Sequence, residues 1–199
     1  MRIFLYKEKV INMINDKLKA NIKKVFPLVV EEWNNNKLPM FEKLIEKSFK
    51  EYFEGRQTQE KTKMVAPIVE TIFERMLNKL EPTFVADEGK GHDYLYGDLP
   101  IECKITCSPS GTWTGNGYTK TPIHILMSFK LEDNGTITDM FCMFANLTDD
   151  IESGWGKKTS LTANFVGLRL LSEDIDNFDV VVGEVLTENK LLKVVRDGS

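Results

Sequence analysis

Asp93, Glu102 and Lys104 are the residues of this chain whose types and spacing could do chemistry. Glu102 and Lys104 are two residues apart in an apolar, strand-like segment, so their side chains share one face of the strand. Gly97-Asp98 lies between Asp93 and Glu102 and predicts a turn. Because the chain reverses at such a turn, we expect Asp93 to come back alongside Glu102 and Lys104.

Two carboxylates and an amine at one place suit the hydrolysis of a phosphodiester bond. Proteins usually hold Mg²⁺ through one or two carboxylates, and the ion then activates a water beside a phosphate. We expect Asp93 and Glu102 to be metal ligands, with the backbone carbonyl of Cys103 as a third. Lys104 would orient the metal-bound water or stabilise charge in the transition state. The carboxylates would raise its pKa and the metal would lower it, and the sequence does not decide between them. The alternative is a surface hairpin with a cross-strand Glu–Lys pair.

Asp93, a gap of eight residues and then Glu102-Cys103-Lys104 together resemble the motif of the PD-(D/E)XK nuclease superfamily, most familiar in type II restriction endonucleases. His92 stands where the motif often has a proline. The resemblance implies a restriction-endonuclease-like mixed central β-sheet, flanked by helices, that carries the three residues. It also implies a further acidic residue near the metal, on the helix before the first motif strand. Glu70 is the candidate for this residue, ahead of Glu74.

The hydrophobic pattern predicts helices first and strands afterwards. Apolar residues at helical spacing predict helices over about 5–26, 28–33, 39–55 and 65–80. Pro27 permits a break, and the three asparagines 34–36 predict a turn. Short strands are expected at 84–86, 94–96, 100–105, 123–130, 138–147, 178–186 and 191–195. The fold class is therefore α/β (α+β). We expect one domain over 1–199, in which 1–55 is a helical dimerisation region and 56–199 is the catalytic and DNA-recognition core.

A loop without acidic residues follows the motif and is predicted to contact DNA. Its Ser, Thr, Asn and Lys side chains can reach phosphates and base edges, and its aromatic rings can stack. Long loops in compact domains are usually functional. The predicted contacts are Ser108, Ser110, Thr112, Trp113, Thr114, Asn116, Tyr118 and Lys120.

Two further polar segments are candidate DNA contacts. Lys157 and Lys158, with Asn164 nearby, lie in a second stretch without acids that runs from residue 153 to 172. Gln57 and Gln59 lie just before the predicted catalytic helix. For all three segments the alternative is an ordinary solvated loop.

The charge is unevenly distributed. Residues 1–80 carry 16 Lys and Arg against 11 Asp and Glu, whereas residues 81–199 carry 10 against 19, and the whole chain has a net charge of −4. No Asp or Glu occurs from residue 103 to 131, although the second part of the chain is acidic overall. A phosphate-facing surface needs this local absence of negative charge. Buried strands, which carry few charges of any kind, are the alternative explanation.

Composition favours a cytoplasmic protein that does not bind a membrane, and the resemblance to restriction endonucleases implies a prokaryotic source. No apolar run approaches the ~20 residues of a membrane span. Residues 1–8 show no signal-peptide pattern. The chain has only three cysteines, and a small odd number argues for reduced thiols.

Together these features predict a type II restriction endonuclease of a restriction–modification system. It would cut double-stranded DNA at a short palindromic sequence with Mg²⁺ and without a nucleotide cofactor. A small chain with one catalytic set implies a homodimer, because two-fold protein symmetry mirrors the symmetry of the site. One alternative is a repair or recombination nuclease of the same superfamily that reads a mismatch or a DNA structure. Another is a DNA-binding module that cuts nothing.

Overall fold

The computed structural model describes residues 14–87, 92–108, 112–115, 121–148, 151–155 and 166–197. The helical elements are α2 (Asp16–Glu32), the π-helix η1 (Trp33–Lys37), α3 (Leu38–Ile45), α4 (Phe49–Tyr52), α5 (Thr58–Leu80) and the 3₁₀-helix η2 (Ser172–Asn177). The strands are β1 (Phe84–Ala86), β2 (Tyr94–Tyr96), β3 (Leu99–Thr106), β4 (Thr114–Gly115), β5 (Ile123–Leu131), β6 (Ile137–Asn146), β7 (Gly154–Trp155), β8 (Val166–Arg169), β9 (Phe178–Val182), β10 (Glu184–Glu188) and β11 (Leu191–Val195).

The central sheet has six strands in the order β1-β2-β3-β5-β6-β9. Strands β1, β2 and β3 pair antiparallel, β3 and β5 pair parallel, and β5, β6 and β9 pair antiparallel. The sheet is therefore mixed. The predicted α/β class, with a mixed central sheet flanked by helices and an N-terminal helical region, is confirmed.

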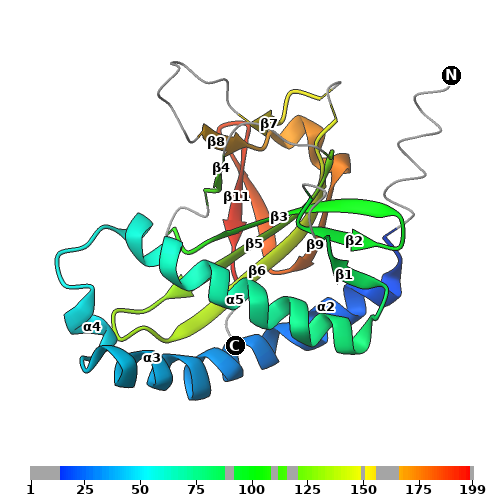
Figure 1. The fold of residues 1–199 in the computed structure, drawn as a ribbon. Helices are drawn as coiled ribbons and strands as arrows, with labels where there is room; N and C mark the ends of the chain where they lie inside the picture. The colour runs from blue at the N-terminus through cyan, green and yellow to red at the C-terminus, as the bar shows by residue number, and fades with distance from the viewer. Residues whose placement is uncertain are drawn as a thin grey trace, which may run out of the picture.

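The two faces of the central sheet are covered by different layers (Figure 1). On one face, alternate residues of β3, β5 and β6, such as Cys103 and Ile125, pack into one core with α2 and α5. On the other face, Leu126 and Phe141 pack against the small sheet β4-β8-β7 and the hairpin β10–β11. The face on which a side chain of β3 lies therefore decides whether it meets the helices or the β layer.

The N-terminal helices differ from the prediction at their boundaries. Pro27 does not interrupt the helix, since α2 continues through it to Glu32. Phe26, Val29 and Trp33 are all buried around that point. Their burial outweighs the roughly 3 kcal/mol that an internal proline costs.

The predicted turn at residues 34–36 is also wrong. These asparagines lie in η1, where the Asn34 side chain accepts from the Ile137 N–H at 2.8 Å and donates to the Ile137 carbonyl at 2.8 Å. The indole Nε1–H of Trp33 donates to the Gly135 carbonyl at 2.8 Å. Contacts with the β5–β6 turn thus hold the segment in a helical form that its local sequence does not favour.

Two other predicted elements are each divided in two. The helix expected over 39–55 stops at Ile45, and α4 begins after Ser48, whose side chain forms a capping box with Glu51. The strand expected over 178–186 is interrupted at Gly183, which has φ +83°. A Cβ at Gly183 would collide with the Val195 carbonyl and the Phe141 ring. The strand is therefore interrupted where the backbones of Gly183 and Val195 approach each other closely.

The N-terminal helices belong to the same core as the sheet. Leu18 and Val25 of α2 and Phe49 of α4 are fully buried in the cluster that includes Ile101 and Ile125 of the sheet. Among the described residues, no helix is long and apolar enough to cross a membrane.

Candidate active site

The predicted hairpin forms and brings Asp93 to the motif strand. Tyr94 of β2 pairs with Ile101 of β3, so Asp93 lies opposite Glu102. The turn between the strands contains Gly97 in the left-handed region, with φ +60°. An Oδ2 atom of Asp93 accepts a hydrogen bond from the Cys103 N–H at 2.6 Å. The prediction that Asp93 approaches Glu102 and Lys104 is confirmed.

Three oxygen atoms converge on the ammonium group of Lys104. Its Nζ donates to Glu102 Oε1 at 2.5 Å, to the Cys103 carbonyl at 2.8 Å and to Asp93 Oδ2 at 3.3 Å. These are the three groups that the sequence assigns to a metal. In the described structure the cation that they surround is the ammonium of Lys104.

The surroundings of Lys104 keep its side chain positively charged. Burial alone would lower its pKa. The hydrogen bond to Glu102 and the negative charges of Asp93 and Glu102 together outweigh burial and raise the pKa above its usual value. Lys104 is therefore an ammonium at neutral pH, which donates hydrogen bonds and cannot accept a proton from water.

Glu70 of α5 lies beside this group, on the side of β3 that faces the helices. The hydroxyl of Tyr94 donates to Glu70 Oε1 at 3.1 Å. Burial, and next the charge of Asp93, raise the pKa of Glu70. Cys103 faces the same core, and burial raises the pKa of its thiol well above the ordinary value. The prediction that the Cys103 side chain points into the core is confirmed.

The expected metal ligands do not belong to a cluster of three metal-binding side chains (His, Cys, Asp or Glu) among the described residues. By strand alternation Glu102 and Lys104 share the face that carries Leu126, whereas Glu70 belongs to α5, which packs on the opposite face. Two carboxylates and a carbonyl that already surround one cation nevertheless fit Mg²⁺, which takes its remaining ligands from water and phosphate.

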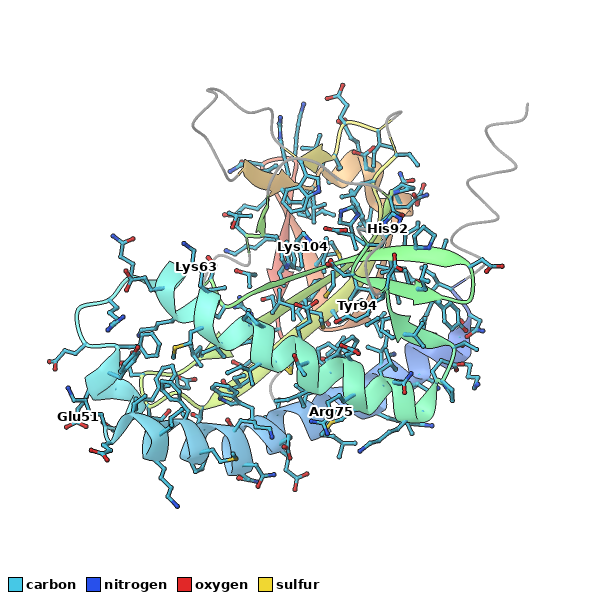
Figure 2. All side chains as sticks on the ribbon, in the orientation of Figure 1. Glu51, Lys63, Arg75, His92, Tyr94 and Lys104 are labelled. Carbon is cyan, nitrogen blue, oxygen red and sulfur yellow. The ribbon has the colours of Figure 1, made fainter. Side chains whose placement is uncertain are left out.

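A cavity of about 590 Å³ lies beside these residues, between α5 and the end of β3. Strand β2 pairs with β3 only as far as Ile101, and the cavity begins where that pairing ends. The described residues that line it are Thr62, Lys63, Ala66, Pro67, Glu70, Asp93, Cys103, Lys104, Ile105, Thr106, Ser108, Thr112 and Thr114. Figure 2 shows Lys63 and Lys104 on the same side of α5, with Arg75 on the other side.

His124 lies on the strand next to the one that carries Glu102 and Lys104. It lies on β5 in register with Glu102 and is fully buried. Its Nδ1 is 3.1 Å from the Pro122 carbonyl, and its Nε2 is 3.3 Å from the indole Nε1 of Trp155. A carbonyl only accepts and an indole N–H only donates, so the ring is the neutral tautomer that carries its proton on Nδ1. Burial lowers the pKa of His124 to about 4, and the ring stays neutral.

The structure places some of the predicted DNA contacts at the cavity and excludes one. Ser108, Thr112 and Thr114 line it together with Asp93 and Lys104. Trp113 is wrong as a stacking residue in this conformation. Its side chain is only 2% exposed, and its Nε1–H donates to the Met127 carbonyl at 2.7 Å in the core of the β layer.

Of the remaining predicted contacts, one has a described side chain and the others lie outside the described side chains. Gln57 is exposed and is the N-cap residue of α5. It is not among the residues that line the cavity. Outside the described side chains lie Gln59, Ser110, Asn116, Tyr118, Lys120, Lys157, Lys158 and Asn164.

Two residues at or near the site, Lys63 and Arg196, were not predicted from the sequence. Lys63 lines the cavity, and its place seven residues before Glu70 on one helix could have revealed it. Arg196 follows β11 and donates from Nη2 to the Ser108 carbonyl at 2.6 Å and from Nε to Ser128 Oγ at 2.6 Å. It therefore ties the C-terminal hairpin to the loop after β3. No local pattern indicated this role, because the contact spans 88 positions.

Comparison with known proteins adds no relative. No protein-family model, no curated protein sequence and no solved structure matches this chain. A functional assignment therefore depends on the chemistry of the described site.

Proposed function

We propose that this protein is a Mg²⁺-dependent endonuclease that cuts double-stranded DNA at a short palindromic sequence, as type II restriction enzymes do. The observation that carries the proposal is the convergence of Asp93, Glu102 and the Cys103 carbonyl on one cation, Lys104 Nζ, at the edge of an open cavity. A surface Glu–Lys pair needs neither the third oxygen nor the cavity.

The residues of the chain divide the proposed reaction between binding and charge stabilisation. Asp93, Glu102 and the Cys103 carbonyl would hold Mg²⁺, which when bound polarises a phosphate and lowers the pKa of a coordinated water. With those oxygens holding the metal, the Lys104 ammonium would be free to donate to the phosphate or to the attacking water. Its raised pKa keeps it cationic, so its role is to stabilise negative charge in the transition state.

Glu70 would act as a second source of negative charge next to Asp93. Its raised pKa means that it ionises less readily than an exposed carboxyl group. A divalent cation bound close by would favour its ionised form. Glu70 would therefore gain its full charge when the site is loaded.

The proposed enzyme is a cytoplasmic homodimer, so that each subunit cuts one strand of a symmetric site. Met40 and Leu44 of α3 support a contact through the N-terminal helices, since their side chains are 63% and 82% exposed. The three cysteines are buried free thiols, which is compatible with a reducing prokaryotic cytoplasm.

The test is incubation of the purified protein with supercoiled plasmid DNA in Mg²⁺, with EDTA and the Lys104→Ala variant as inactive controls. The matched control is Lys130→Ala, which removes an exposed lysine that pairs with Glu132 at 2.7 Å at the far end of β5. We expect discrete fragments from the wild type and from Lys130→Ala only. Nicking at mismatches or at DNA structures would favour a repair nuclease instead, and the absence of Mg²⁺-dependent cutting would overturn the proposal.

A further inference from the structure

The cavity beside the catalytic residues continues along α5 toward the start of that helix. Lys63, Ala66, Pro67 and Glu70 line it and are spaced three, four and seven residues apart, so they form one stripe on the helix. Glu70 lies at the catalytic end of the stripe, because it accepts a hydrogen bond from the Tyr94 hydroxyl and lies near Asp93.

The other end of the cavity is fixed by a contact between α5 and the end of β3. Thr62 Oγ1 lies 2.7 Å from Cys107 Sγ. Lys63 follows Thr62, so it lies at the end of the cavity farthest from Glu70. Figure 2 shows Lys63 near the N-terminal end of α5, on the same side of the helix as Lys104.

The side chains between the two ends are suited to a phosphate backbone. Five of the lining residues carry a hydroxyl group: Thr62, Thr106, Ser108, Thr112 and Thr114. The acidic side chains among the described lining residues are Glu70 and Asp93, both at the catalytic end. The rest of the described lining carries hydroxyl side chains and the lysine Lys63, and side chains of these kinds make many of the contacts between proteins and DNA phosphates.

The length of the cavity exceeds what a single phosphate group needs. Seven residues of α-helix separate Lys63 from Glu70, which corresponds to about 10 Å along the axis. A DNA strand carries one phosphate about every 3.4 Å of duplex axis. A strand whose cut phosphate lies at the Glu70 end therefore brings a phosphate about three positions away to the level of Lys63.

We propose that Lys63 binds a second, uncut phosphate of the strand that is being cleaved, so that the cavity takes a stretch of polynucleotide and not an isolated phosphoester. This inference rests on the proposed function, since it assumes that the cut phosphate lies at Lys104. Lys63 is a binding residue under this proposal and takes no part in the chemical step.

The test measures binding of a fluorescein-labelled 24-base-pair duplex in Ca²⁺ between 50 and 200 mM KCl. Each phosphate contact contributes about 0.9 to the slope of log K against log salt, so Lys63→Ala should reduce the slope by about that amount. Between 50 and 200 mM KCl the affinity for the duplex decreases in both proteins, and the fold-decrease for Lys63→Ala should be about 3.5 times smaller than that for the wild type. Lys63→Arg should restore the wild-type slope, because it keeps the positive charge.

Lys79→Ala is the matched control, because Lys79 is an exposed lysine of the same helix that lines a separate depression with Leu28 and Met76. Its slope should equal that of the wild type. If the wild type cuts plasmid in Mg²⁺ but Lys63→Ala keeps the full slope, the role of Lys63 is wrong and the proposed function stands. If the wild type neither cuts nor binds DNA, both are wrong.

Discussion

In the proposed mechanism the ammonium of Lys104 would have two successive partners. The first are the carboxylates of Asp93 and Glu102, and the second is the phosphate. Before metal binds, its ammonium neutralises Asp93 and Glu102 from distances of 3.3 and 2.5 Å. The same oxygens are the proposed ligands of Mg²⁺. If these oxygens hold a divalent ion, the ammonium of Lys104 would have to leave them and would then be available to the phosphate.

Replacing Lys104 with methionine should strengthen metal binding while it abolishes cleavage. Without the ammonium, two adjacent carboxylates lose their counter-charge, and a gain of about tenfold in affinity is expected for partly exposed charges of this kind. Titration calorimetry with Mn²⁺ measures the Kd of each protein directly. Glu102→Gln is the control that should lose affinity. An unchanged or weaker Kd for Lys104→Met would show that the ammonium does not compete with the metal.

At the scale of single elements, the hairpin that carries the site was predictable because its signals are local. A glycine turn, an alternating strand and a fixed loop length determine that Asp93 lies opposite Glu102. The helix boundaries were not predictable in the same way. Pro27 and Asn34 are held in helical conformations by burial and by the β5–β6 turn, which lies about a hundred positions away. The capping box at Ser48 and Glu51 was a local signal that could have been used.

Substitutions of Gly97 in the hairpin turn should destabilise the protein, because this residue has a positive φ. Its φ is +60°, and among the described residues, its two chain neighbours apart, no atom lies within 4 Å of a Cβ placed there, so the strain of a substitution comes from its backbone conformation. Gly97→Ala should lower the free energy of unfolding by about 1 kcal/mol. Gly97→Asn should cost less, because asparagine tolerates the left-handed region. Urea unfolding of both variants provides the measurement, and equal costs would contradict the assignment.

Strand β5 should make stability depend on pH through His124. The folded pKa is about 4, below the ordinary value of 6.5, so the unfolded chain binds a proton that the folded chain excludes. The contribution is fully present above pH 6.5 and is lost as the pH falls toward 4. Between pH 7.5 and 5.0 the wild type should lose about 2 kcal/mol more than His124→Gln, which cannot titrate. Parallel losses in the two proteins by urea unfolding would argue against a buried neutral histidine.

At the scale of the whole molecule, the helical region and the sheet form one structure. Gly135 of the β5–β6 turn lies against Phe49 and Leu38 so closely that a Cβ there would meet Phe49 Cβ and Leu38 Cδ1 at 2.8 Å. Trp33 bonds the carbonyl of the same glycine. The sequence indicated a helical N-terminal region but not this docking, because no local pattern encodes a contact between residues 33 and 135.

The surface of α3 should contain the dimer contact if the protein is a homodimer. Leu44→Glu introduces a charge at a leucine that is 82% exposed, so it should convert a dimer to monomers without unfolding the chain. Leu186→Glu, at an exposed leucine of β10, is the matched control and should leave the dimer intact. Light scattering during size-exclusion chromatography gives the molar mass. A wild-type monomer, or a dimer that survives Leu44→Glu, would contradict this contact.

The most direct test of the central claim is to sequence every DNA end that the protein creates in a random-sequence library in Mg²⁺. The Asp93→Asn variant, which keeps an acceptor for the Cys103 N–H but loses the charge, gives the background. The account predicts ends at one short palindromic sequence, cut at symmetric positions in the two strands, and none above background without a divalent metal. Ends that appear equally with Asp93→Asn, or that share no sequence, would contradict it.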